Sequence, residues 1–261
     1  MKNARLIGYQ IKLNIEAALS FKLSFILQVL CMIISNVAFV IFWYILFDNA
    51  NGTIGNYVFS DVMYLWGITS IGYGLCFLCC AGVSQIGMKI LDGSLDTYIL
   101  QPCPTIIGVI FSSSNVSAIG DILYGIVLIL LTQKITGYLM LITVLSSVTA
   151  AMVIHALLLI WNSLVFFFGN VIGCSFMSLD LLITLSTYPA EIFNDFVKAI
   201  MLSIIPAYFV SHIPLMAINQ HFPIFLLIPL GFALVSNIVG ICLFKLGLRR
   251  YSSSSFITTR S

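Results

Sequence analysis

The sequence predicts an all-α polytopic membrane protein with about six transmembrane helices. Two features of its composition support this fold class: 61% of the 261 residues are hydrophobic, and only 8% are charged. A soluble domain has roughly 45–50% apolar and 25% charged residues. The mean hydropathy of +1.12 points the same way. A formal charge of +2 gives no electrostatic support to nucleic-acid binding, so the main partner expected from composition alone is the lipid bilayer.

Long apolar runs separated by short polar stretches define the expected spans. Most of these runs approach or exceed the ~20 residues that a helix needs to cross a bilayer. The expected spans cover residues 23–47, 61–87, 116–133, 138–168, 174–188 and 223–246. The fourth is long enough that we expect it to be tilted or broken.

The segments that flank these spans complete a single transmembrane domain over residues 1–261. Within residues 1–22, a polar and an apolar stripe recur at helical spacing: Arg5, Tyr9, Lys12 and Glu16, and Ile7, Ile11, Ile15 and Ala18. This pattern predicts an amphipathic helix in the membrane interface; a plain cytosolic extension of the first span is the alternative. Residues 189–222 are apolar but interrupted by Pro189, Pro206 and Pro214, which predicts short re-entrant helices dipping into the outer leaflet.

The distribution of Lys and Arg sets the expected orientation. With six spans and a cytosolic N-terminus, nine of the 11 basic residues lie on the cytosolic side: Lys2, Arg5, Lys12, Lys22, Lys89, Lys245, Arg249, Arg250 and Arg260. Lys134 and Lys198 lie outside. A seventh span over residues 189–222 would place the arginine-rich tail outside, so we expect six spans and both termini in the cytosol.

Residues that could support catalysis or bind a metal form no recognisable pattern. The sequence contains no GxxxxGK[ST] phosphate loop, HExxH or GxSxG motif, which excludes nucleotide binding of that type. The seven cysteines are odd in number and lie mostly in apolar runs, so they do not indicate a disulfide framework. Cys76, Cys79 and Cys80 resemble a metal cluster only in spacing, because they lack His or acidic neighbours; packing within an apolar helix is favoured.

Three ionisable side chains inside the expected spans are candidates for a substrate pathway. Asp180 lies near the middle of the fifth span, where a pathway role and a packing role fit equally. Asp121 lies near the cytosolic end of the third span, where stabilisation by the helix dipole is the favoured alternative. His155 is central in the fourth span, and a neutral histidine hydrogen-bonded to a neighbour is the favoured alternative.

Residues 88–104 form the longest polar-containing stretch between spans. Apolar side chains recur there at spacings of three or four, which predicts one face of a short helix: Leu91, Leu95, Tyr98 and Ile99. Asp92 and Asp96 lie beside this face, and prolines follow it. Such a face suits a groove in a soluble partner. The alternative is contact with the bilayer surface, against which the acids argue because the cytoplasmic leaflet is anionic.

Two motifs resemble those of ABC-2 type transporter permeases. Residues 90–102 read ILDGSLDTYILQP, which is similar to the family stretch G-x-L-D-x-x-L-x-x-P. Residues 247–253 read GLRRYSS, which resembles the G-L-R-R-Y-x-S end of one subfamily, as does the pattern of prolines after the fifth span. Gln101 and Ser252 depart from the family, whose members often have a basic residue and an acid there.

The resemblance implies the transmembrane subunit of an ATP-binding cassette transporter, usually an exporter, in a bacterial plasma membrane. It implies a second permease subunit, identical or paralogous, and two separate ATPase subunits that bind ATP and Mg; this chain would need no cofactor and would not hydrolyse ATP. The short helix between the second and third spans would contact the ATPase through Gly93, Leu95, Asp96, Tyr98, Ile99, Leu100 and Pro102.

Two other functions compete with this one. A secondary transporter or channel would tend to show an internal repeat or an intramembrane charge network, and neither is evident. A membrane-embedded enzyme would need positioned acids, bases or metal ligands. The apolar interior, rich in Phe, Met and Tyr, suits a hydrophobic or cationic-amphiphilic substrate, but it suits plain helix packing equally.

Overall fold

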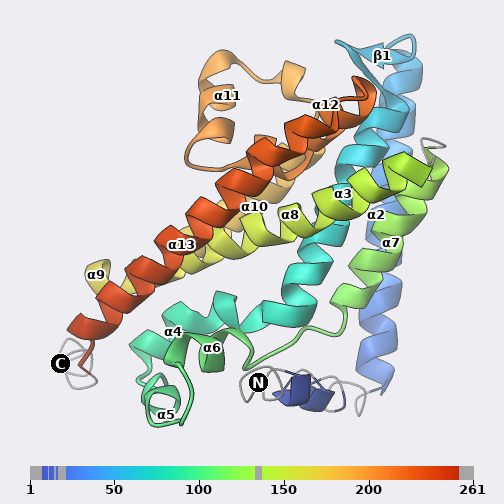
Figure 1. Cartoon of the computed structure of the whole chain (residues 1–261). Helices are drawn as coiled ribbons and strands as arrows, with labels where there is room; N and C mark the ends of the chain where they lie inside the picture. Colours follow the sequence, from blue (N-terminus) through green and yellow to red (C-terminus); the bar gives the residue numbers. More distant parts are fainter. Residues whose placement is uncertain (1–7, 11, 15, 17–21, 133–136, 253–261) are drawn as a thin grey trace.

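A computed structural model describes residues 8–10, 12–14, 16, 22–132 and 137–252 as a bundle of helices (Figure 1). The main helices are α2 (Lys22–Asn49), α3 (Phe59–Cys80), α7 (Ala118–Leu131), α8 (Gly137–Ser163), α10 (Ile172–Thr187) and α13 (Leu227–Arg250). A short hairpin, β1 (Thr53–Ile54) and β2 (Tyr57–Val58), joins α2 to α3. The prediction of an all-α membrane protein is confirmed, with this hairpin as a local addition.

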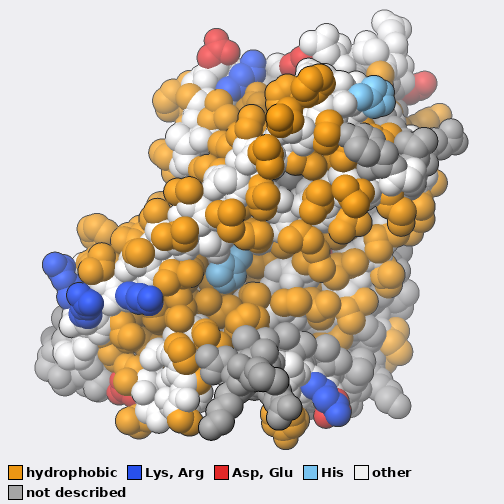
Figure 2. Space-filling view, viewed as in Figure 1, with side chains coloured by type: hydrophobic (Ala, Val, Ile, Leu, Met, Phe, Trp, Pro, Cys, Tyr) orange, Lys and Arg blue, Asp and Glu red, His pale blue; other side chains and the backbone are white. Residues whose placement is uncertain are grey.

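Apolar helices recur in each of the six predicted runs. Three are long and apolar enough to cross a membrane: Phe59–Leu91, Leu139–Phe168 and Pro223–Arg250. Shorter apolar helices in the described residues are Ile34–Asn49, Ala118–Leu131 and Ile172–Thr187. Figure 2 shows a broad hydrophobic band, with charged side chains at its ends over α11 (Asp195–Leu202) and the end of α13. This distribution is what a bilayer requires of a protein surface.

Two of the long helical runs are not continuous α-helices. The second continues from α3 through a 3-10 turn, η1 (Ala81–Gln85), into α4 (Ile86–Leu91), so it extends beyond the predicted end at residue 87. The fourth is interrupted between α8 and α9 (Val165–Phe168). α8 also crosses α3 obliquely in Figure 1. Of the two features expected of the long fourth run, the break is confirmed.

The core lies where α8 packs between α3, α10 and α13. Ile154 and Leu158 on α8 and Ile68 on α3 are fully buried there. α3 and α7 approach closely because each has a glycine at the contact. A Cβ on Gly67 would lie 2.6 Å from Ile129 Cγ1, and one on Gly125 would lie 2.6 Å from the Gly67 carbonyl oxygen. Small residues allow this proximity between membrane helices.

The N-terminal residues that the structure describes, 8–10, 12–14 and 16, are helical. Lys12 Nζ lies 3.7 Å from Glu16 Oε1, and Asn14 Nδ2 donates to Ser114 Oγ at 3.5 Å. These residues lie at the same end of the bundle as α4 (Figure 1). The apolar stripe predicted for an interfacial helix, Ile7, Ile11, Ile15 and Ala18, lies outside the described residues, so that part of the prediction stays open.

Between α10 and α13 the chain forms the predicted series of short helical segments. They are η2 (Ala190–Ile192), α11, the π-helical turn η3 (Tyr208–His212), α12 (Ile213–Asn219) and η4 (Pro223–Leu226). This region lies at the end of the bundle that carries the hairpin (Figure 1). The Glu191 carboxylate accepts hydrogen bonds from the backbone N–H and the side-chain amide of Asn56, both at 2.6 Å. These bonds fasten η2 to the hairpin.

Candidate functional site

The predicted coupling segment, residues 88–104, holds most of α4 and all of α5 (Asp96–Ile99), and α6 (Thr105–Ile110) follows it at the same end of the bundle (Figure 1). Gly93 has a φ of +79°, a left-handed conformation that glycine adopts without steric cost. The turn at Gly93 lets the backbone N–H of Leu95 donate to the Lys89 carbonyl at 3.0 Å. Lys89 Nζ lies 5.3 Å from the centre of the Tyr98 ring, which ties α5 back to α4.

The single apolar face predicted for this segment is wrong in its geometry. Leu95 is fully buried inside this chain, whereas Ile99 is 42% and Leu100 is 86% exposed. The physical reason is the turn at Gly93, which ends α4 before Leu95 and places Leu91 and Leu95 on different helices. Leu95 therefore holds the segment to the bundle, and the apolar surface available to another subunit includes Met88, which is 56% exposed, as well as Ile99 and Leu100.

The two motifs that resemble ABC-2 permeases meet in space. Tyr251, after α13, packs its ring against Phe166 with 6.0 Å between centroids. Burial, and then the nearby Asp96 carboxylate, raises the pKa of Tyr251 to about 12, so its hydroxyl keeps its proton at neutral pH. Asp96 of the coupling segment thus faces the end of the last helix. Pro102 is exposed and follows α5.

Asn162 connects the coupling segment to the helices of the bundle. This α8 residue is fully buried. Its Oδ1 accepts a hydrogen bond from the Gly87 backbone N–H at 3.3 Å, and its Nδ2 donates to Ser175 Oγ at 2.8 Å. A buried amide whose bonds reach α4 and α10 makes relative displacement of these helices costly, because displacement leaves its polar atoms unsatisfied.

A polar cavity of about 390 Å³ lies between α2, α3, α7 and α10. Its lining includes Trp66, Ser70 and Tyr73 of α3, Asp121 of α7 and Thr187 of α10. Asp121 is in the first turn of α7, the position where a helix dipole favours a negative charge and where the sequence-based interpretation of a helix-stabilised acid places it. The same carboxylate also lines the cavity, so the two interpretations are compatible.

Two of the three predicted pathway residues lie near the polar cavity. Asp121 lines it, and Asp180 lies on α10 three residues before Ile183, which also lines it. Asp180 is exposed on a face of α10 that also exposes Met177 and Leu181. His155 is separate: its Nδ1 lies 2.7 Å from Asn237 Oδ1, beside a different cavity of about 420 Å³. The sequence favoured a neutral histidine hydrogen-bonded to a neighbour at position 155, and Asn237 is such a neighbour.

Sequence reasoning missed the α3 side of the polar cavity. Trp66, Ser70 and Tyr73 follow one another at spacings of four and three, which places them on one helical face. They are polar or amphipathic side chains within an otherwise apolar span. This stripe was the signal that could have located the cavity before the structure was known.

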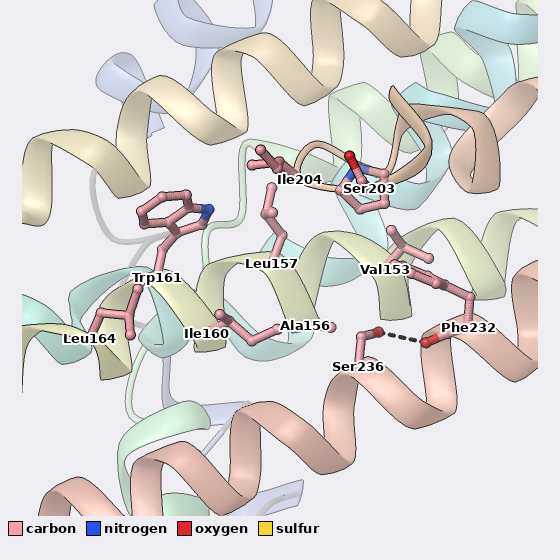
Figure 3. A pocket seen from close by; sticks show the side chains of 11 residues that line it. Val153, Ala156, Leu157, Ile160, Trp161, Leu164, Ser203, Ile204, Phe232 and Ser236 are labelled. Atoms are coloured by element: carbon pink, nitrogen blue, oxygen red, sulfur yellow. Dashed lines mark hydrogen bonds between the residues drawn. The ribbon is translucent and has the colours of Figure 1, made fainter. Parts of the chain in front are cut away.

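A groove of about 240 Å³ lies between α8, α13 and residues 203–206 (Figure 3). Trp161, Leu157, Ile204 and Phe232 line it, and the Ser236 hydroxyl donates its hydrogen to the Phe232 carbonyl at 2.7 Å. Its walls offer apolar contact without converging polar groups. No cluster of three His, Cys, Asp or Glu side chains suited to a metal ion is found in the part of the chain that the structure describes.

The apolar helices define a multi-pass α-helical membrane protein, and comparison with known families shows that it is a transport component. Residues 33–255 match the model of a family described as ABC-2 family transporter protein, and the chain belongs to this family. The chain is therefore a membrane permease component of an ABC transporter, as its motifs predicted. Searches of curated proteins and of solved structures gave no match.

Proposed function

We propose that this chain forms the translocation pathway of an ATP-driven exporter in a bacterial plasma membrane. It pairs with a second permease subunit, identical or paralogous, and two ATPase subunits that bind ATP and Mg dock against the coupling segment. The observation that carries this proposal is the family match over residues 33–255, together with Ile99 and Leu100 exposed beyond the end of the bundle. The chain itself contributes no phosphate loop.

In this proposal all six apolar helices span the membrane, with both termini in the cytosol. Residues 8–10, 12–14 and 16, α4 to α6 and the end of α13 lie at one end of the bundle (Figure 1), and five of the 11 basic residues belong to these segments: Lys12, Lys89, Lys245, Arg249 and Arg250. An excess of Lys and Arg marks the cytosolic side. Residues 189–222, at the other end, then dip into the outer leaflet and return as re-entrant segments.

The coupling segment passes movement of the ATPase into the bundle. Closure of the ATPase pair on ATP displaces α5, and the hydrogen bonds of Asn162 carry the displacement of α4 to α8 and α10. Asp180 lies on the exposed face of α10. A carboxylate at mid-span costs about 2.5–3.5 kcal/mol on insertion scales, so we place this face toward the second permease subunit and the pathway. Asp121 lines the pathway at Tyr73, and His155 lines the separate cavity beside Asn237.

The energetic part of the proposal predicts that the transporter hydrolyses ATP only with its partner. A tagged chain isolated from its native membrane in mild detergent should co-purify with a subunit that has a phosphate loop. ATP hydrolysis should follow this subunit through further separation, because the chain has no nucleotide-binding motif of that type. Robust hydrolysis by a preparation free of any other subunit would contradict the proposal.

The proposed topology predicts one-sided chemical access to Cys103. This half-buried cysteine lies between α5 and α6. In a variant without the other six cysteines, a membrane-impermeant maleimide should label Cys103 in inside-out vesicles and leave it unmodified in sealed right-side-out cells. Replacing Cys103 by serine as well and introducing Asn51→Cys moves the single thiol to the turn before β1 and should reverse the pattern. Labelling of Cys103 from outside would rule out the six-span topology.

A further inference from the structure

The polar cavity between α2, α3, α7 and α10, already described around Trp66, Tyr73 and Asp121, offers mainly hydrogen-bond acceptors. The hydroxyls of its four Ser and Thr side chains all donate their hydrogens within the chain: Ser70 to the Asp121 carbonyl at 2.8 Å, Thr69 to the Leu65 carbonyl at 2.8 Å, Thr187 to the Ile183 carbonyl at 3.0 Å, and Ser117 to Asn115 Oδ1 at 2.6 Å. A hydroxyl has one hydrogen and two lone pairs. What these side chains leave for a ligand is therefore their lone pairs.

The Asp121 carboxylate adds a negative charge to this lining. Within the described part of the chain, no hydrogen bond or ion pair to its carboxylate oxygens is found, and neither Lys nor Arg lines the cavity. The Asp180 carboxylate also lies close enough to act on Tyr73. A charge inside a membrane span is normally compensated by a partner. A cation that enters the cavity would supply this compensating charge.

Two aromatic rings line the same space, and neighbouring rings fix both. The Trp66 ring lies 3.5 Å from that of Phe39 between centroids and meets Tyr124 edge-on at 6.4 Å. The Tyr73 ring stacks on Phe77 at 4.3 Å. Faces of Trp and Tyr attract organic cations, and rings that are already held in place lose little freedom on binding.

We propose that this cavity is the binding site for an organic monocation, such as a quaternary ammonium or phosphonium, with an apolar body. This inference rests on the proposed function, because it names the substrate class of the same permease. A small hard cation fits poorly, since no cluster of metal-binding side chains is found among the described residues. An anion would meet the Asp121 carboxylate and the lone pairs. The donors left in the described lining are the Asn36 amide, the Trp66 indole N–H and the Tyr73 hydroxyl.

The test is equilibrium binding of tetraphenylphosphonium to the purified full-length chain in lipid nanodiscs, with empty nanodiscs as the background. Tetraphenylborate has the same shape and the opposite charge, so it should bind poorly when it is titrated separately. Asp121→Asn should weaken phosphonium binding at least tenfold, and Asp121→Glu should retain it. Asp195→Asn, the same change of charge on α11 away from the cavity, should leave binding unchanged. Trp66→Leu should weaken binding by removing an aromatic face.

Equal binding of the two ions in separate titrations, or unchanged phosphonium binding in Asp121→Asn, would overturn the assignment. If Asp121→Asn does not fold, the two titrations of the unaltered chain still decide the charge preference. The measurement needs no ATPase, so it is independent of the test of the proposed function. Loss of the cation site would leave the permease assignment intact, and failure to isolate an ATPase would leave the cation site intact.

Discussion

Gly82→Ala is expected to destabilise the protein by about 3 kcal/mol, toward the upper end of what overpacking a core usually costs. Gly82 is buried in η1, where the second helical run turns toward α4. A Cβ at this position would overlap the Val109 carbonyl oxygen and lie 2.6 Å from the Ile110 carbonyl oxygen. Both obstacles are backbone atoms of α6, which cannot rotate away as a side chain can. The substitution should therefore separate η1 from α6 and loosen the coupling segment.

Gly231→Ala is the matched control for this prediction. Gly231 lies within α13, and a Cβ there would meet nothing within 4 Å. Alanine is favoured over glycine inside a helix by roughly 0.5–1 kcal/mol, so this variant should be as stable as the unaltered chain or slightly more so. Thermal unfolding of both purified variants in the same detergent makes the comparison. If the melting temperature of Gly82→Ala equals that of Gly231→Ala, the close contact between η1 and α6 is not present in solution.

The sequence predicted the helical runs well because the mean hydropathy over a long window distinguishes segments that lie in lipid from segments that lie in water. All six apolar runs contain a helix close to the expected bounds, and the long fourth run is broken at Leu164. The predicted end of the second run was less accurate. Ile86 and Ile90 of α4 are fully buried, yet they continue the apolar run of α3, and hydropathy alone does not distinguish burial in protein from burial in lipid.

The candidate site was only partly predictable, because periodicity describes one helix and the site joins several. Leu91 and Leu95 have helical spacing, but the positive φ of Gly93 places them on different helices. Asp121 and Asp180 are 59 positions apart in the sequence, and only the packing of α7 and α10 around α3 brings both toward Tyr73. The contact between Asp96 and Tyr251 likewise depends on where α13 ends.

Leu100→Asp is expected to release the ATPase from the permease while leaving the membrane domain folded. Leu100 is 86% exposed, directly after α5, and Ile99 beside it is 42% exposed. An apolar side chain this exposed at the end of the bundle gains stability only by contact with another surface. Loss of a central apolar anchor typically costs about 2 kcal/mol or more at an interface, which corresponds to roughly 30-fold weaker binding. Co-purification of the ATPase and ATP-dependent transport should both fall.

Three further variants separate this interface effect from charge and from unfolding. Asn51→Asp adds the same charge at the opposite end of the bundle, where aspartate tolerates the left-handed φ of 58°, so it should retain ATPase binding. Leu100→Met keeps an apolar side chain and should also retain it. Leu95→Asp places a charge in a fully buried position, so it should reduce the melting temperature as well as ATPase binding. If Leu100→Asp binds the ATPase and transports as well as Leu100→Met, the ATPase contact does not lie on α5, and the exposed pair rests on the bilayer surface instead.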